Sequence, residues 1–516
     1  MHKSISDFHR SLILGTIMLA TFMVSIEATI VATAMPRVAG ELGGFSYYSW
    51  VFSSFLLAQS ATTPIYGKLS DMFGRKPVLM TGIAVFLAGS LLCGFASSMS
   101  SLIAFRLLQG LGAGAIYPVA MTVIGDLYAL DERGRAQGMI AVVWAVSAVI
   151  GPLAGGIIIG RLSWAWIFWI NLPFGVLAIV GFLLFLREQT ERRRVRIDYE
   201  GAVLFSAAIV SLLTLLAETE ASGPVRAGLA CMFAVTGALF IVQERRIASP
   251  IISIELWTRR LIATSNIATL LAGMALIGLT TILPIYVQGV LGFSPIVAGT
   301  TLTALVVGWP LAVMLSSRLF KTFGIRRSVR TGSLVFPLGA VILLFLTPHS
   351  HPAVAAAASF LMGFGMGLVS ITGIMLVQES VEWSMRGSAT ASIIFSRSLG
   401  NTLGAAALGA ILNAGIAHYG TGRLAIKLRQ LLNAPTGLAQ LTGQQDVRLV
   451  LFHALYWSFW GVFVVALLAV LSSWLIPVAN ESKNARTKEE TDVASREQVD
   501  ALPRQRGEIP SPSLRR

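Results

Sequence analysis

The chain has 516 residues, of which 55% are hydrophobic and only 12% are charged, and its mean hydropathy is +0.74. Soluble proteins carry about 25% charged residues, so this composition excludes an ordinary soluble domain. The formal net charge of +14 does not indicate nucleic-acid binding, because the basic residues lie in short polar connections between apolar blocks.

The apolar residues come in blocks of about 20, the helix length that crosses the hydrocarbon core of a bilayer. The first block is longer than the core of a signal peptide, which has about 7–15 residues, so we expect it to be retained as a helix. The sequence predicts an all-α polytopic membrane protein with fourteen spans, at about 11–35, 48–66, 78–97, 102–125, 136–160, 164–186, 199–217, 226–243, 262–288, 295–317, 329–347, 353–377, 388–413 and 449–477.

An internal repeat divides the chain. The loop GKLSDMFGRKP at 67–77 is echoed by SRLFKTFGIRR at 317–327, each between two apolar blocks. The repeat predicts two six-helix halves with a substrate site between them, separated by two inserted spans. The expected domains are an N-terminal bundle at 1–187, a linker at 188–260, a C-terminal bundle at 261–477 and a disordered cytoplasmic tail at 478–516.

The loop 67–77 resembles the signature of the major facilitator superfamily of secondary transporters, where it joins helices 2 and 3 on the cytoplasmic side. Four further stretches carry a narrower resemblance: IEATIVATAMP (26–36), SWAWIFWINLPFG (163–175), IDYEGAVL (197–204) and RSLGNTLGAAALGAIL (397–412). They resemble the fourteen-helix drug:proton antiporter family, although Glu27 stands where Asp is usual in that family and Ala165 stands where Arg is common. The resemblance implies the major facilitator fold over about residues 11–477, with two six-helix bundles and two inserted linker helices.

The loop 67–77 is expected to tie helices together at one end. Gly67 permits close approach, Asp71 can pair with Arg75, and Asp126 at the end of the fourth span can join them. The alternative is an exposed salt bridge worth about 0–1 kcal/mol. The predicted cytoplasmic gate comprises Gly67, Asp71, Gly74, Arg75, Lys76 and Asp126.

Glu27 is the one acid placed well inside an apolar block, and an ionisable group there is a functional candidate. Arg106 is the natural partner, because the two depths differ by about four residues, or roughly 6 Å. Arg106 opens RLLQGLGAGAIYP, which resembles the helix 4 motif of the superfamily, whose Arg is implicated in proton coupling. We expect Glu27 and Arg106 to couple protons; the alternative is a structural ion pair.

The fifth span contains SAVIGPLAGG at 147–156, in which a proline frees a backbone carbonyl and glycines allow tight packing. It resembles the motif that marks antiporters within the superfamily, formed here by Gly151, Pro152, Gly155 and Gly156. Interface anchoring or lipid contact explains most membrane aromatics, and only a minority need face a cavity. The candidates for a substrate cavity are Trp50, Phe55, Gln59, Tyr117, Trp144, Tyr286, Trp309 and Arg397.

The sequence offers no nucleotide-binding loop and no catalytic triad, so we expect no enzyme activity, and transport must be driven by a gradient. His349 and His351 form an HxH pair with no third ligand nearby, so neither a metal site nor a cofactor is expected. Cys93 and Cys231 both fall in apolar blocks and are expected to be free thiols. The expected partners are a small-molecule substrate, protons and the lipid bilayer, for a monomer that binds no nucleic acid.

These features predict a proton-driven antiporter in the cytoplasmic membrane that exports amphipathic or lipophilic compounds, such as organic cations and drugs, by alternating access. Substrate is expected between the halves, where it would compete with or exclude the proton at Glu27. An exporter of a specific lipid, siderophore or metabolite stays open as an alternative. A channel, which would show flux without proton coupling, and a membrane-embedded enzyme are less favoured.

The distribution of Lys and Arg predicts that both termini lie in the cytoplasm. With the N-terminus inside, thirty basic residues fall in cytoplasmic segments and seven in external loops. Reporter fusions near Arg194 and Gln430 should therefore read as cytoplasmic and external, respectively. The opposite pattern, or an odd number of crossings, would exclude the design of two halves with two inserted helices.

Overall fold

A computed structural model of the chain describes residues 7–43, 47–187, 198–217, 222–247, 250, 254–420, 424, 427–428 and 445–477. These residues form helices and connecting turns, without a β-strand among them. The helices belong to one compact unit, Met1–Ile476. The expected disordered tail at 478–516 lies outside the described residues.

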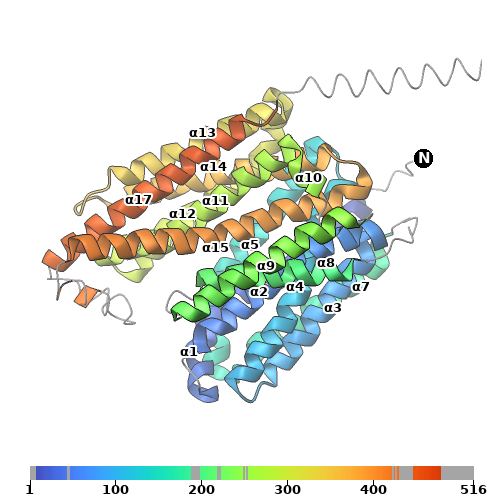
Figure 1. Cartoon of the computed structure of the whole chain (residues 1–516), viewed down its shortest axis with the longest axis horizontal. Coiled ribbons are helices and arrows are strands. Elements are labelled where there is room, and N and C mark those ends of the chain that lie inside the picture. Colours follow the sequence, from blue (N-terminus) through green and yellow to red (C-terminus); the bar gives the residue numbers. More distant parts are fainter. Residues whose placement is uncertain are drawn as a thin grey trace, which may run out of the picture. The chain divides into compact units, whose positions relative to one another are not determined.

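The first group of helices is drawn in blue to teal in Figure 1. Its apolar core also takes in side chains from later in the chain, such as Leu256, Ile374 and Ile393. Buried side chains of this core include Ile13, Phe86, Ile116, Ile140 and Phe182. Because each residue comes from a different helix, the core joins most of the group. The group comprises α1 (Asp7–Leu42), α2 (Tyr48–Phe73), α3 (Arg75–Gly94), α4 (Met99–Leu127), α5 (Leu130–Arg161), α6 (Trp166–Trp169) and α7 (Asn171–Phe185).

The second group has a separate core, in which Tyr286, Phe336, Met366 and Phe459 are all 0–1% exposed. Figure 1 shows these helices on the opposite side of the unit from α1, α3 and α7. The group comprises α11 (Arg260–Ile285), η2 (Tyr286–Val290), α12 (Pro295–Phe323), α13 (Ile325–Leu344), α14 (Pro352–Glu379), η3 (Trp383–Met385), α15 (Arg386–Tyr419) and α17 (Gln445–Trp474).

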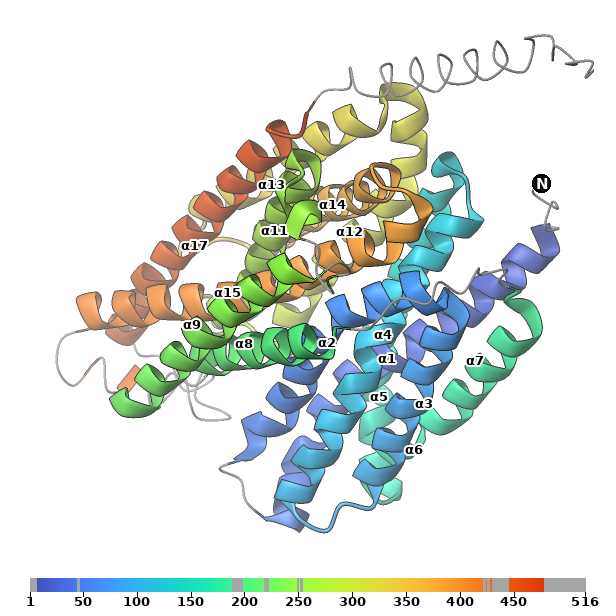
Figure 2. The same cartoon turned by 45° about the vertical axis from the view of Figure 1, so that its right-hand side comes forward.

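Three further helices connect the groups: α8 (Tyr199–Ala217), α9 (Gly223–Arg246) and α10 (Ile254–Thr258). α8 packs on α2 and α15, so it covers the seam between the groups (Figure 2). Phe205 of α8 contacts Phe395 of α15 with ring centroids 5.5 Å apart, and both lie in a cluster with Leu57 of α2. α8 therefore packs against both groups through apolar contacts.

Thirteen helical segments within the described residues are long and apolar enough to cross a membrane. The fourteenth expected span is α2, which has 26 residues and is long enough to cross but carries more polar side chains. It packs against α4, α15 and α8, so much of its surface faces protein and not lipid. α15 and α17 extend into the predicted external connection at 414–448, to Tyr419 and from Gln445.

The internal repeat is visible in the backbone. Gly74 separates α2 from α3 with φ 98° and ψ 159°, and Gly324 separates α12 from α13 with φ 79° and ψ 154°. Only glycine adopts such positive φ values at no steric cost. The two halves of the repeat therefore use the same glycine-dependent break between consecutive helices.

Close approach of α3 and α4 depends on glycines. A Cβ at Gly112 would overlap the backbone nitrogen of Phe86 and lie 2.5 Å from the carbonyl oxygen of Gly82. We expect Gly112→Ala to cost about 1–3 kcal/mol, because a tightly packed contact would have to open. The measurement is the thermal unfolding midpoint of the purified protein in detergent.

The matched control is Gly237→Ala on α9, where a Cβ would meet nothing within 4 Å. Alanine favours a helix over glycine by about 1 kcal/mol, so this variant should unfold at the same temperature or higher. An unchanged midpoint for Gly112→Ala would show that the two helices are not held at this distance.

Candidate functional site

A cluster of five buried polar residues, here called the Glu27 cluster, lies inside the first group: Glu27, Ser90, Arg106, Gln109 and Asn171. The side chains of Glu27 and Arg106 are 0% and 2% exposed, and Arg106 Nη1 donates to Glu27 Oε1 at 2.5 Å. Asn171 Nδ2 donates to Glu27 Oε2, also at 2.5 Å. Both carboxylate oxygens are therefore hydrogen-bonded, and one guanidinium balances the charge.

Arg106 is held from several helices. Its Nε donates to the carbonyl oxygen of Val51 on α2 at 3.1 Å, and its Nη1 also donates to Gln109 Oε1 at 2.7 Å. Its Cζ lies 4.3 Å from the centroid of the Phe55 ring, in cation–π geometry. A buried ion pair needs such extra contacts to offset the loss of hydration. α1, α2 and α4 together therefore fix the position of the guanidinium.

The amide and hydroxyl members of the cluster were not predicted from the sequence. Ser90 Oγ accepts from Gln109 Nε2 at 3.2 Å and from Asn171 Nδ2 at 3.0 Å, and donates to the carbonyl oxygen of Phe168 at 2.7 Å. Asn171 carried a signal, as a lone amide in the apolar stretch 163–175. Gln109 lies one turn from Arg106 on the same helix face. Ser90 had no distinguishing signal.

α5 contacts the part of α1 that carries Glu27. The hydroxyl oxygens of Ser25 and Ser147 are 2.6 Å apart, and Thr29 Oγ1 donates to the carbonyl oxygen of Ser147 at 3.1 Å. A Cβ at Gly151 would overlap the Thr29 side chain. Displacement of α1 near Glu27 would therefore act directly on α5.

The other residues of the predicted antiporter motif lie differently. Gly155 is buried, whereas Pro152 and Gly156 are exposed, and a Cβ at Gly156 would meet nothing within 4 Å. α5 continues as a helix through Pro152 to Arg161. Tight packing at this motif thus occurs at Gly151 and not at Gly156.

A second cluster, the Asp71 cluster, consists of Asp71, Arg75, Asp126 and Arg386, where α2 leads into α3 and α14 leads into α15. Asp71 Oδ1 lies 2.9 Å from Arg75 Nη1, whose Nε lies 3.3 Å from Asp126 Oδ2. Arg386 Nη1 lies 3.2 Å from Asp126 Oδ1. The Asp71 and Arg75 side chains are 4% and 3% exposed, so this is not a surface salt bridge. Since Arg386 belongs to α15, the cluster links the two groups.

Asp71 also caps α15. The backbone nitrogens of Gly387 and Ser388 donate to its two carboxylate oxygens at 2.8 and 2.7 Å, and Ser388 Oγ donates at 2.7 Å. The first amides of a helix favour an anion because they have no intrahelical acceptor. Gly67 permits this contact, since a Cβ there would lie 2.8 Å from the carbonyl oxygen of Gly387.

The remaining predicted gate residues have separate roles. Gly74 provides the break before α3, with its positive φ. Lys76 Nζ donates to the carbonyl oxygen of Leu183 on α7 at 3.0 Å, within the first group. Arg75 also reaches η3, where its Nη2 donates to the carbonyl oxygen of Trp383 at 2.9 Å and its Cζ lies 4.5 Å from that ring.

Further contacts between the groups at this end were not predicted. Arg133 Nη1 on α5 lies 2.6 Å from Glu379 Oε1 on α14. Gln378 Nε2 on α14 donates to the carbonyl oxygen of Met121 on α4 at 3.2 Å. In the sequence, Arg133 and Arg386 were only loop charges, because nothing there indicated which acids they would meet.

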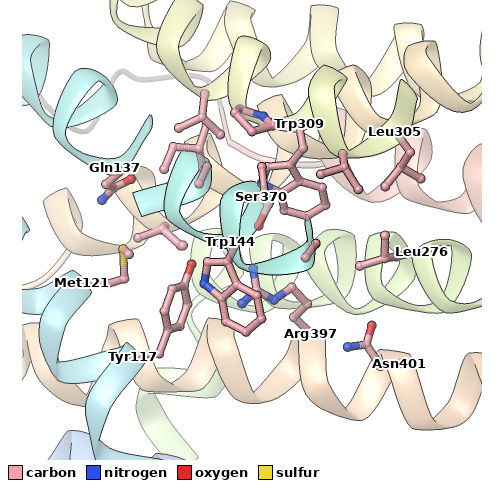
Figure 3. A pocket seen from close by; sticks show the side chains of 18 residues that line it. Tyr117, Met121, Gln137, Trp144, Leu276, Leu305, Trp309, Ser370, Arg397 and Asn401 are labelled. Atoms are coloured by element: carbon pink, nitrogen blue, oxygen red, sulfur yellow. The ribbon is translucent and has the colours of Figure 1, made fainter. Parts of the chain in front are cut away.

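A cavity of about 330 Å³ lies between the groups, lined by α4 and α5 on one side and by α11, α12, α14 and α15 on the other. Figure 3 shows four predicted residues among those lining it: Tyr117, Trp144, Trp309 and Arg397. The Tyr117 and Trp144 rings meet edge to face at 6.3 Å, and Arg397 Cζ lies 5.2 Å from the centroid of the Tyr117 ring. The cavity therefore combines an aromatic wall with a cation.

Four other cavity candidates do not line it. Tyr286 is 0% exposed in the core of the second group, where its hydroxyl donates to the carbonyl oxygen of Thr347 at 2.7 Å. Phe55 lies under Arg106, and Trp50 packs on the apolar cluster around α8. Gln59 is half-buried on α2. Their residue types suited a cavity, but the helix face on which each lies directs it elsewhere.

No group of three His, Cys, Asp or Glu side chains among the described residues could hold a metal ion. His351 Nδ1 accepts from the backbone nitrogen of Ala353 at 3.2 Å and so caps α14. Cys93 is buried, Cys231 is exposed, and both are free thiols.

Comparison with known proteins places these features in a family. Residues 17–405 match the Major Facilitator Superfamily. The chain is 33% identical over 451 residues to the Multidrug transporter protein MdtP of Bacillus subtilis (strain 168), covering 86% of this chain and 83% of the relative. It is 36% identical over 403 residues to Multidrug resistance protein 3 of the same organism, covering 77% and 78%.

Among solved structures, the human organic anion transporter MFSD10 is similar to this chain with a TM-score of 0.61 and 15% identity, covering 90% of this chain and 99% of the other. At this identity the likeness shows the fold alone. The family match and the identity to the Bacillus proteins agree with the two groups of long apolar helices. The chain therefore belongs to the major facilitator superfamily and is a multi-pass membrane transporter.

Proposed function

We propose that this transporter is a proton-coupled antiporter that exports amphipathic compounds by alternating access. The observation that carries the proposal is the fully buried Glu27–Arg106 pair, held in the same group of helices that forms one wall of the cavity. The printed names of the two Bacillus proteins, a multidrug transporter and a multidrug resistance protein, support efflux of chemically varied compounds.

Glu27 is the proposed proton carrier. As a carboxylate it balances Arg106 and accepts from Asn171. A proton on Glu27 removes the counter-charge of Arg106 and leaves a buried cation with only neutral acceptors, which is costly. Protonation therefore favours an arrangement in which Arg106 is better hydrated, and the proton shifts the equilibrium by its different affinity for the two arrangements.

The link from Glu27 to the cavity is proposed to run through α1 and α5. Glu27 does not line the cavity, whereas Trp144 of α5 does. α1 is joined to α5 by Ser25 and Thr29, which flank Glu27. Proton and substrate would thus act at separate places and communicate through the packing of these helices, in contrast to direct competition for one site.

The Asp71 cluster is the proposed cytoplasmic gate. The excess of Lys and Arg assigns this end to the cytoplasm. Its contacts join α2, α3 and α4 to α15, which supports a closed cytoplasmic end in this arrangement. Opening it requires breaking the Asp126–Arg386 pair and uncapping α15, which gives the gate two distinct states.

The proton role of Glu27 is tested with Glu27→Gln in proteoliposomes. We expect uptake of substrate driven by an imposed pH gradient to be lost, because the amide cannot exchange a proton. Glu27→Asp should retain much of the activity, since it keeps the carboxyl group. The matched control is Glu41→Gln, which alters an exposed acid on the same helix that pairs with Arg37.

Loss of Glu27 removes the counter-charge of Arg106, so the thermal midpoint of each variant is measured alongside transport. Exchange of substrate without a pH gradient should persist in Glu27→Gln if the protein is folded. Gradient-driven transport in Glu27→Gln at the wild-type rate would remove this residue from the mechanism.

The gate is tested with Asp71→Asn. The substitution replaces the carboxylate that pairs with Arg75 and accepts from two backbone N–H groups at the start of α15 by a neutral amide. We expect a shift of about 1–2 kcal/mol toward the state open to the cytoplasm, or about 5- to 30-fold in population. The reporter is Ser316→Cys in a Cys231→Ser background. Ser316 is 0% exposed and faces Gly134 where α12 meets α5.

Labelling of Ser316→Cys by a membrane-impermeant maleimide, applied to inside-out vesicles, should accelerate when Asp71→Asn is added. Lys68→Gln, which removes a charge near the same end of α2, serves as the control. Equal labelling with and without Asp71→Asn would show that the Asp71 cluster does not hold this end closed.

A further inference from the structure

The charge of the central cavity is unbalanced. Of the 18 residues that line it, Arg397 is the one that carries a full charge, and none is an acid. Most of the others are apolar or aromatic. The one full charge in the wall of this cavity is therefore positive.

Arg397 has no protein anion to balance it among the described residues. No carboxylate there lies within ion-pair distance of its guanidinium, and its described interaction is the cation–π contact with Tyr117. A guanidinium has five N–H donors in a planar fork suited to a carboxylate or sulfonate. By contrast, the buried Arg106 is paired with Glu27.

Two amide side chains in the same cavity have buried polar atoms without a hydrogen-bond partner. Asn401 follows Arg397 by one turn of α15, on the same face, and its Oδ1 is buried without a hydrogen bond. Gln137 is 2% exposed, and neither its Nε2 nor its Oε1 has a partner. Buried polar groups without partners are costly, so such a group lining a cavity indicates a ligand or water that completes it.

The positions of these groups suit an amphiphile. Figure 3 shows Arg397 between Tyr117 and Asn401, with Trp144 beside it, while Gln137 lies at the other end of the cavity. Trp309 adds a second indole to the wall. The volume of about 330 Å³ is at the lower end of small-molecule sites, which span about 300–1,000 Å³.

We propose that this cavity binds an amphiphilic organic anion, with its carboxylate or sulfonate on Arg397 and its apolar body against Trp144 and Trp309. Asn401 Oδ1, which can only accept, is left to a hydroxyl or amide N–H of the ligand or to water. The inference rests on the proposed export function and specifies its substrate class, and it reverses the expectation of organic cations. A cation would meet repulsion from Arg397 with no acid in the wall to offset it.

Binding is measured apart from transport, by equilibrium dialysis of the purified full-length protein against two dyes. Fluorescein and rhodamine 123 share a three-ring body but are an anion and a cation at pH 7.4. Protein-free detergent micelles give the background for each dye. Wild type should bind fluorescein saturably and more tightly than rhodamine 123.

Arg397→Gln should weaken fluorescein binding about tenfold or more, as expected for loss of a hydrogen bond to a charged group, and should narrow the preference for the anion. Arg397→Lys should retain part of the fluorescein binding, because the positive charge remains. Arg226→Gln is the matched control: it removes the same charge from an exposed position on α9 and should bind both dyes as wild type does.

Three results would overturn the inference. Wild type could bind rhodamine 123 more tightly than fluorescein, or Arg397→Gln could bind fluorescein as wild type does. The third result is that none of three anions, fluorescein, 1-anilinonaphthalene-8-sulfonate and decanoate, binds saturably.

The same proteins are then tested in proteoliposomes. Anion binding without gradient-driven transport would overturn the proposed antiport and leave the inference standing. Gradient-driven transport of rhodamine 123 without anion binding would support the proposed antiport and overturn the inference that the cavity binds anions.

Discussion

The structure depends on keeping two opposite charges, Glu27 and Arg106, buried inside a bundle of helices. Neither charge is stable there alone, and the pair persists because Gln109, Asn171 and the Val51 carbonyl complete its hydrogen bonds. These contacts draw on α1, α2, α4 and α7, so the packing of the first group is tied to the ionisation of one carboxyl group. Any change in that ionisation must be answered by movement of these helices or by entry of water.

The two copies of the internal repeat share the same glycine break between helices, but the side chains that follow the break differ. Gly74 and Gly324 make nearly the same break between helices. After Gly74 comes Arg75, which joins Asp71 and Asp126, whereas Ile325 follows Gly324. The network around Asp71 is built on the first copy and is directed at the start of α15 in the second group. At one end of the transporter, the ion pairs and hydrogen bonds of the Asp71 cluster therefore hold the two groups together.

The sequence predicted the helices well, because spans of about 20 apolar residues separated by charged loops permit few alternatives. It also predicted the pairs Glu27–Arg106 and Asp71–Arg75, since depth and spacing along a helix brought each together. α2 was predicted as a span at 48–66, but it is not among the thirteen described helical segments that are apolar enough to cross a membrane.

Contacts between segments far apart in the chain could not be predicted from the sequence alone. Arg386 and Glu379 gave no sign of meeting Asp126 and Arg133, because their partners lie about 250 residues away in the chain. For the same reason the lining of the cavity was predicted in part: Tyr117 and Arg397 face each other, whereas Tyr286 is turned into its own core. Residue type shows that a side chain suits a cavity, but only packing shows which face it occupies.

The central claim, exchange of protons for substrate, is tested most directly by proton movement in vesicles prepared at equal pH on both sides. Wild-type proteoliposomes are loaded with a non-fluorescent substrate and a pH-sensitive dye in the lumen. They are then diluted into substrate-free buffer so that substrate flows out. The account predicts that the lumen acidifies as protons enter in exchange, and that a protonophore abolishes the change. Substrate efflux at constant lumenal pH, or an alkaline shift, would contradict antiport.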